Sequence, residues 1–111
     1  MKDDKLYLIH ILECLKRIEQ YTFDGKESFF NDTKCQDAVL RNLQTMAEST
    51  QRLSSSLKSA NPEIEWDGIS GFRNVLVHDY FGLNLSRVWN IVEHHLSDFK
   101  QKIEIILRQL D

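Results

Sequence analysis

The segment WDGISGFRNVLVHDY, residues 66–80, decides the fold class of this chain. At about 100° per residue, its apolar side chains gather on one arc of a helix, which suits packing against a core. That arc consists of Ile69, Phe72, Val75, Leu76 and Tyr80. We expect a helix that continues at least to His78. Its start is left open between Pro62, which suits a first turn, and Asp67, which suits an N-cap.

Apolar residues at helical spacing recur on both sides of this segment. The other expected elements are a helix at residues 4–21, a loop at 22–28, a helix capped by Asn31, Asp32 or Thr33 that runs to about Lys58, a break at 81–84 and a helix at 85–110. The sequence has no internal repeat and no long alternating run that would demand a sheet. It therefore predicts an all-α protein, an antiparallel bundle of four to five helices.

Length and composition indicate a single domain spanning residues 1–111, because a second core would have too little material. The formal net charge of -3 argues against a surface coated in positive charge, so any contact with nucleic acid must come from a local patch. No apolar run approaches the ~20 residues of a membrane span. Acids precede the first apolar stretch and Glu13 interrupts it, unlike in a secretory signal, so we expect a cytoplasmic protein without membrane contact. Cys14 and Cys35 lack C-x-x-C spacing and are expected to be reduced core thiols.

The face of the 66–80 helix opposite the apolar arc carries mostly short side chains, with a cation and an imidazole at its edges. Its members are Asp67, Ser70, Gly71, Arg73, Asn74 and His78. Arg73 and His78 are five residues apart, so on a helix they point about 140° apart and cannot easily grip one small target. Short side chains let another backbone approach closely, and a two-fold axis along this face would bring Arg73 of one chain to His78 of another. We therefore expect a homodimer with a composite site.

The octapeptide RNVLVHDY, residues 73–80, has the pattern R-x4-H-x-Y and resembles the signature of HEPN-superfamily ribonucleases, especially the HepT toxins. The resemblance covers most of the chain, through residues 38–43, Glu48, residues 66–69, Tyr80-Phe81 and Val88-Trp89. It implies the toxin of a type II toxin–antitoxin system, an endoribonuclease that cleaves RNA without a metal ion or other cofactor. The implied partner is an antitoxin that is similar to a minimal nucleotidyltransferase. The resemblance also implies AMPylation of Tyr80 and an accessory role for Glu48.

The motif side chains suit such chemistry on physical grounds as well. RNA is cut without a metal when a base takes the proton of the ribose 2′-OH, a donor stabilises the crowded phosphate and an acid protonates the leaving oxygen. Histidine exchanges protons near neutral pH, so His78 is the candidate base or acid. Arg73 offers a planar fork that matches phosphate oxygens, and Asn74 would orient His78 or the substrate. The pair His94-His95 has no accompanying ligands at metal spacing, so no metal site is expected.

Tyr80 is expected at the margin of the same site. It follows Arg73 by seven residues, nearly two turns, so on a continuing helix the two side chains project at almost the same angle. An AMP group attached to Tyr80 would bring bulk and a phosphodiester charge that pairs with Arg73. We therefore expect the modification to switch cleavage off.

Other interpretations of these residues stay open. In an arbitrary helical protein, Arg73 would be a surface ion-pair partner, His78 a structural histidine and Tyr80 a half-buried ring with a wet hydroxyl. The alternative functions are a noncatalytic substrate-binding or adaptor subunit of a nucleotidyltransferase, and a structural dimer without activity. Trp66 and Trp89 are expected in the bundle core rather than as platforms for base stacking.

Overall fold

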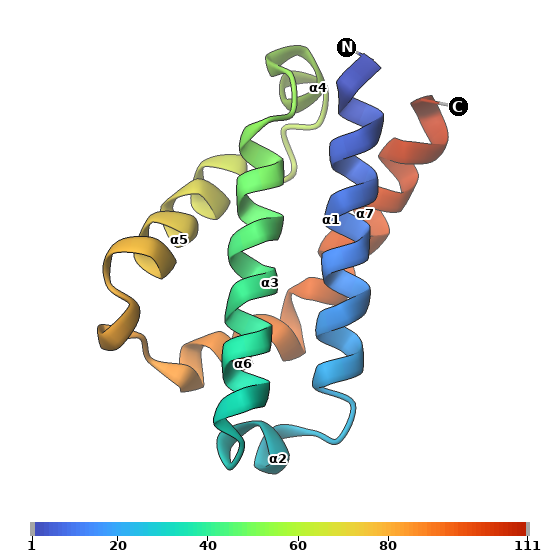
Figure 1. Ribbon diagram of the computed structural model, residues 1–111. Helices are drawn as coiled ribbons and strands as arrows, with labels where there is room; N and C mark the ends of the chain where they lie inside the picture. Colours follow the sequence, from blue (N-terminus) through green and yellow to red (C-terminus); the bar gives the residue numbers. More distant parts are fainter. Residues whose placement is uncertain (1, 111) are drawn as a thin grey trace.

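The computed structural model describes residues 2–110 (Figure 1). This part of the chain contains seven α-helices and one short 3₁₀ helix, joined by turns. In chain order they are α1 (Lys2–Tyr21), α2 (Lys26–Phe30), α3 (Thr33–Gln51), α4 (Ser55–Ala60), α5 (Trp66–His78), the 3₁₀ helix η1 (Tyr80–Gly82), α6 (Leu85–His94) and α7 (Leu96–Leu110). The predicted all-α class is confirmed, although the helices outnumber the expected four to five. Residues 1 and 111 of the expected domain lie outside the described residues.

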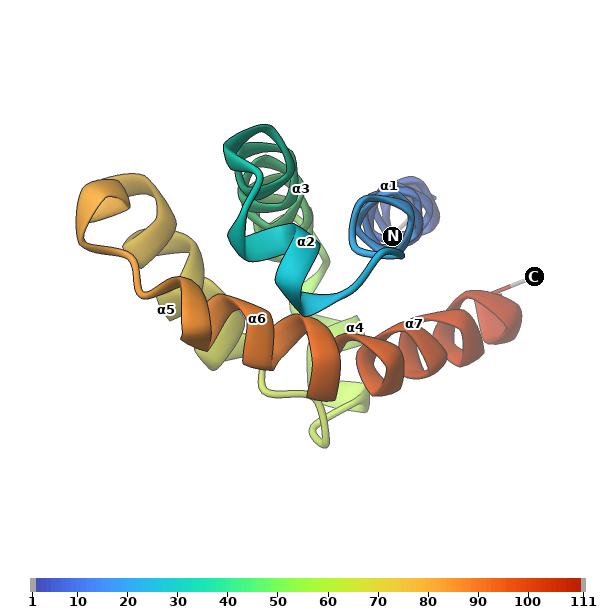
Figure 2. The ribbon, with the colours of Figure 1, turned by 90° about the horizontal axis from the view of Figure 1, so that it is seen from below.

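A central antiparallel pair, α1 and α3, organises the bundle (Figure 1). Along its flanks, α5 packs against α3 and α7 packs against α1. Seen from below, α5, α6 and α7 form a curved layer across one side of this pair (Figure 2). The short helices α2 and α4 lie at opposite ends of the pair.

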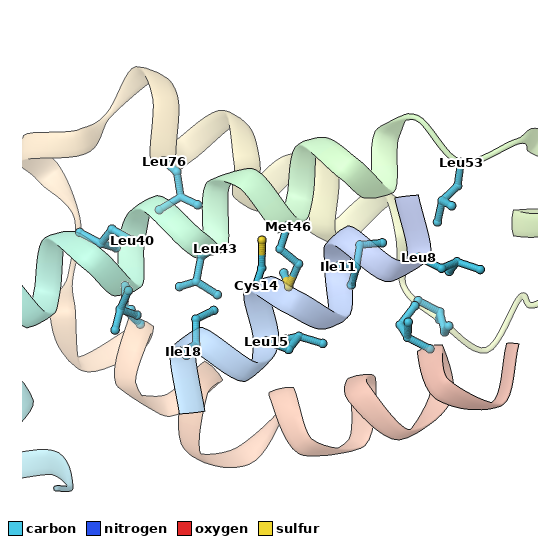
Figure 3. Packing of buried hydrophobic residues seen from close by; sticks show 14 of the residues in the cluster. Leu8, Ile11, Cys14, Leu15, Ile18, Leu40, Leu43, Met46, Leu53 and Leu76 are labelled. Carbon is cyan, nitrogen blue, oxygen red and sulfur yellow. The ribbon is translucent and has the colours of Figure 1, made fainter. Parts of the chain in front are cut away.

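The core fills the space between the central pair and the curved layer. In α1, a stripe at helical spacing is almost completely buried, and it faces a second stripe from α3 (Figure 3). The two stripes consist of Leu8, Ile11, Leu15 and Ile18 in α1 and Leu40, Leu43 and Met46 in α3. Full burial of each such side chain contributes about 1.5–3 kcal/mol to folding. Trp89 is buried and Trp66 packs against this core, as expected.

A short helix occupies part of the segment expected as a loop. The chain turns after Tyr21, and Gly25 adopts a φ of 94°, the left-handed region that favours glycine. The helix α2 then begins at Lys26, so the loop prediction is wrong for residues 26–28. Phe29 is fully buried, and its ring centroid lies 5.3 Å from that of Trp89. Burial of the Phe29 ring holds the short helix α2 in place. The polar residues that precede Phe29 in the sequence do not indicate a helix.

The helix expected from residue 33 to about Lys58 is instead two helices, α3 and α4. Its start is as predicted, because the Asp32 side chain caps α3 by accepting hydrogen bonds from the N–H groups of Lys34 and Cys35. At the break, the N–H of Ser54 donates to Asp4 Oδ1 over 2.8 Å, and the Ser54 hydroxyl accepts from the N–H of Leu57 as the N-cap of α4. Serine competes well for such capping positions, so the chain restarts a helix here.

The helix expected over residues 85–110 is also divided, at His95. This residue has φ -119° and ψ -30° and separates α6 from α7. A straight helix of that length would extend about 39 Å. The bend instead lets the chain pass from α6, which lies in the curved layer beside the central pair, to α7, which runs along α1 (Figures 1 and 2).

Two smaller expectations concern the membrane and the cysteines. Within residues 2–110, no helix combines the length and the apolar character that crossing a membrane requires.

Both cysteines are free thiols, as expected, with Cys14 buried and Cys35 half-buried. The Cys35 thiol donates a hydrogen bond to the carbonyl oxygen of Tyr21 over 3.1 Å.

Candidate functional site

The helix α5 carries the motif and begins at Trp66, which settles the start that the sequence left open. Glu65 stands at its N-cap position without a side-chain cap, and Asp67 lies in the first turn. Leu76 is buried, whereas Ile69 and Phe72 pack against the core from its edge. The helix reaches His78, as expected, and ends there, before Tyr80.

The apolar arc of α5 is narrower than predicted. Val75 is 43% exposed and Tyr80 is 42% exposed, so the prediction that both face the core is wrong. Neighbouring helix residues point about 100° apart, and Val75 therefore turns away from α3 when Leu76 faces it. The exposed face of α5 thus includes an apolar side chain beside Gly71, Asn74 and His78.

Arg73 leans from α5 toward α3, where it meets Glu48. Its Nη2 lies 3.2 Å from Glu48 Oε2, and the two side chains are 27% and 38% exposed. Its Nη1 donates a hydrogen bond to Asn74 Oδ1 over 3.3 Å, and its Nε is buried without a partner among the described residues. The structure therefore brings Arg73, Asn74 and Glu48 together, and Asn74 supports Arg73 rather than His78.

His78 lies apart from this cluster. Its side chain is exposed at the last residue of α5, and it makes no hydrogen bond or ion pair with any residue between 2 and 110. Both of its ring nitrogens are thus without a partner among the residues that the structure describes. The predicted divergence of Arg73 and His78 around the helix therefore leaves them as separate groups within one chain.

Tyr80 does not continue α5, which corrects the prediction that it projects alongside Arg73. The backbone leaves the helix at Asp79, with φ -134° and ψ 41°, and Tyr80 opens the 3₁₀ helix η1. The Tyr80 hydroxyl donates a hydrogen bond to Asp37 Oδ1 on α3 over 2.7 Å. Asp37 and Glu48 are separated by about 16 Å of helix rise, so α3 holds Tyr80 and Arg73 at different places.

The contact with Asp37 changes the acidity of the phenol. The hydrogen bond to Asp37 is the main reason that the pKa of Tyr80 lies above its ordinary value, with burial and the negative charge of Asp37 adding to it. Sequence reasoning missed Asp37, because the two residues are 43 positions apart and no spacing links them. Only the packing of α5 against α3 reveals the pair.

The remaining titratable side chains do not gather into a metal site. Within residues 2–110, no group of three or more His, Cys, Asp or Glu side chains is arranged to hold a metal ion. His94 and His10 are exposed, and the Nε2 of His94 lies 3.2 Å from Glu93 Oε1. The histidines outside the motif are therefore surface side chains, as expected.

Comparisons with known proteins agree on one family. A family model described as "Ribonuclease HepT-like" matches residues 11–106. A probable ribonuclease HepT of Thermococcus cleftensis is 33% identical over 104 residues, which cover 93% of this chain and 94% of that protein. The mRNA nuclease HepT of Shewanella oneidensis is 32% identical over 120 residues, which cover 86% of this chain and 90% of that protein.

A longer relative matches through part of its length. A Methanocaldococcus jannaschii protein, whose name joins a gamma-glutamylcyclotransferase to a candidate RNase, is 35% identical over 111 residues. The match covers 99% of this chain, which spans 50% of that protein's length. No solved structure matches the chain at a significant level.

Proposed function

The chain belongs to the HepT-like ribonucleases of the HEPN superfamily, and from this premise we propose that it is the toxin of a type II toxin–antitoxin system. In this proposal, it cleaves RNA without a metal ion at a composite site in a homodimer. The observation that carries the proposal is the state of the motif side chains. Arg73 is held in place by Glu48 and Asn74 with several N–H groups to spare, and His78 is exposed and has no side-chain partner within residues 2–110.

The reaction requires a proton acceptor, a proton donor and a cation. A histidine takes the proton of the ribose 2′-OH, whose oxygen attacks the adjacent phosphorus. The bond to the 5′-oxygen breaks, that oxygen receives a proton, and a 2′,3′-cyclic phosphate remains. The guanidinium of Arg73 stabilises the charge that builds up on the phosphate.

The dimer follows from the number and direction of these groups. One motif histidine per chain does not readily serve as acid and base in the same turnover, whereas two chains supply two. The exposed face of α5 permits close approach, because a Cβ added at Gly71 would meet no atom within 4 Å. A two-fold axis along this face would place Arg73 of one protomer near His78 of the partner subunit.

The cleavage proposal is tested with purified Arg73→Ala and His78→Ala variants. We expect each substitution to lower RNA cleavage by at least 100-fold, which is roughly what one acid–base or charge-stabilising group contributes, while circular dichroism and dimer mass stay unchanged. Wild-type cleavage should persist in a metal chelator and should leave 2′,3′-cyclic phosphate ends. Undiminished cleavage by both variants would instead support a noncatalytic adaptor, and a strict requirement for added magnesium would contradict the metal-independent mechanism.

Neutralisation is proposed to occur by AMPylation of Tyr80 by a cognate minimal nucleotidyltransferase. The exposed position of Tyr80 on η1 supports this role, because a second protein can reach its hydroxyl. The transferred group adds a bulky anion to the surface, which repels the RNA backbone. In this proposal the AMP group acts through its bulk and charge rather than by pairing with Arg73, because α3 holds Tyr80 at Asp37 and Arg73 at Glu48.

The test uses intact mass after co-expression with the transferase. We expect AMP-sized additions on wild type and none on Tyr80→Phe, which should still cleave RNA but resist neutralisation. Tyr21→Phe is the matched control, because Tyr21 is 41% exposed and lies outside the motif. AMP mapped to another residue, or equal neutralisation of both variants, would exclude Tyr80 as the control point.

A further inference from the structure

A carboxylate on α3 directly contacts the hydroxyl of Tyr80. Asp37 Oδ1 accepts the Tyr80 hydrogen bond over 2.7 Å, which is within the reach that proton transfer to a base requires. Both residues are exposed, so a second protein can approach the contact. The proton of the phenol therefore already points at an acceptor within the same chain.

A small pocket adjoins this contact. It has a volume of ≈ 220 Å³ and is lined by Asp37, Leu40, Arg41, Gln44, Leu76 and Tyr80. Arg41 follows Asp37 by one helical turn, and its guanidinium forms no ion pair with a residue in the described part of the chain. The carboxylate of Asp37, the phenol of Tyr80 and the guanidinium of Arg41 thus line the same pocket.

We propose that Asp37, Tyr80 and Arg41 form a preorganised acceptor site for nucleotidyl transfer, in which Asp37 is the base and Arg41 binds the transferred phosphate. This inference rests on the proposed neutralisation and names residues of this chain that would carry it out. The co-reactant is a nucleoside triphosphate delivered by the transferase.

The transfer balances with these groups. Tyr80 Oη attacks the α-phosphorus, and a new P–O bond forms as the bond between that phosphorus and the oxygen bridging to the β-phosphorus breaks. Pyrophosphate leaves, and the phenol proton passes to Asp37 Oδ1. The phosphodiester that remains on Tyr80 carries one negative charge, which the fork of Arg41 can bind.

A phenol with an ordinary pKa of about 10 forms little phenolate at neutral pH, and the raised pKa of Tyr80 makes phenolate scarcer still. The proton must therefore leave during the attack. A carboxylate in hydrogen-bond contact can take it at that moment. The same bond also fixes the direction of the attacking oxygen.

The inference is tested by measuring the initial rate of AMP addition to the full chain by purified cognate transferase and ATP, with intact mass as the readout. Asp37→Asn keeps an oxygen that can accept the Tyr80 hydrogen bond but cannot take the proton. We expect its rate to fall by about 100-fold, the lower end of what a general base contributes. Asp37→Glu should recover part of the rate, and Arg41→Gln should lower it by about tenfold.

Three controls separate chemistry from folding. Glu13→Gln removes a charge from an exposed position on α1 and should keep the wild-type rate. Spectrophotometric titration should show a lower pKa for Tyr80 in Asp37→Asn than in wild type, which verifies the contact in solution. Circular dichroism of each variant should match wild type.

The outcomes distinguish this inference from the function on which it rests. If wild type is modified on Tyr80 and Asp37→Asn is modified equally fast, Asp37 only ties η1 to α3 and the inference is overturned while the proposed function stands. If wild type takes no AMP on Tyr80, the proposed neutralisation and the acceptor site both fail. A loss confined to Asp37→Asn and Arg41→Gln supports the site.

Discussion

Arg73 is tied to two side chains of its own chain, one on its own helix and one on α3. Glu48 and Asn74 hold two of its nitrogens, but the Arg73–Glu48 pair is partly exposed. An ion pair in such a position contributes at most about 1 kcal/mol to stability, because water screens both charges. Its larger effect is to fix the guanidinium in one direction, so that the remaining N–H groups can meet a phosphate.

Glu48→Gln should therefore affect catalysis more than folding. We expect the free energy of unfolding to change by less than about 1 kcal/mol. Cleavage should fall by about tenfold, because a misplaced catalytic group loses rate steeply with small shifts. Urea unfolding and single-turnover cleavage measure the two quantities. Glu19→Gln breaks the ion pair with Lys100, which is also partly exposed, and serves as the control. Equal cleavage by both variants would remove Glu48 from the site.

At the residue level, the sequence predicts what the local pattern encodes. The helical wheel correctly separates Arg73 from His78, and the family resemblance suggests Glu48, which the structure places against Arg73. The contact between Asp37 and Tyr80 is not predicted from the sequence, because a contact across 43 positions depends on how two helices pack. Tyr80 is misplaced for a related reason. The wheel assumes an unbroken helix, whereas the backbone turns at Asp79.

The helix α5 presents an exposed stripe that its own chain leaves open. Gly71 is central to it, and no atom of the described residues lies close enough to require a glycine at that position. Glycine lowers helix stability by about 1 kcal/mol relative to alanine. A glycine kept here is therefore a cost to the monomer, which the proposed close approach of a second chain would offset.

Gly71→Leu should consequently separate folding from assembly. We expect the free energy of unfolding of the monomer to rise by about 0.5–1 kcal/mol, because leucine is a better helix former than glycine. The dimer should dissociate at least tenfold more easily, and cleavage should fall with it. Sedimentation equilibrium and cleavage at matched concentrations measure both effects. Gly68→Ala gains similar helix propensity and would meet only Glu65 Cβ at 3.6 Å, so it should keep the dimer. A Gly71→Leu dimer with full activity would refute this interface.

The sequence predicts that helices exist better than it predicts where they stop. Leu53 and Leu57 are both buried although α3 ends at Gln51. The helical spacing of apolar residues therefore continues across the break, and the apolar pattern does not indicate where α3 ends. The same happens at His95, where the stripe of residues 85–110 continues across the bend. Apolar spacing records which side chains face the core. It does not record a local capping bond that ends one helix and starts another.

The carboxylate of Asp4 joins the start of α1 to the turn between α3 and α4. Asp4 in the first turn of α1 accepts bonds from the N–H and the hydroxyl of Ser54, over 2.8 and 2.6 Å. Burial raises the pKa of Asp4 and the hydrogen bonds from Ser54 lower it, and the pKa lies below its usual value. The ionised form is therefore favoured in the folded chain.

This contact makes stability depend on pH in a defined direction. Because the folded pKa lies below the unfolded value of about 3.9, the contribution of Asp4 is complete above pH ~4 and is lost as the pH falls through the folded pKa. We expect Asp4→Asn to lower the free energy of unfolding by about 1–2 kcal/mol at pH 7 and by progressively less below pH ~4. Urea unfolding as a function of pH measures the difference. The exposed neighbour Asp3, changed to Asn, should show no comparable loss.

The imidazole of His78, which is exposed and has no partner among the described residues, has a consequence for dimers that mix two forms of the chain. If each proposed active dimer needs the histidines of both chains, a chain that lacks His78 disables every normal chain with which it pairs. In a cell that makes equal amounts of both forms, random pairing leaves about one dimer in four with two intact chains. The cell then keeps about a quarter of the activity instead of half. Loss of this one side chain would accordingly act as a dominant-negative change, because it lowers the activity below the half that the intact chains alone would supply.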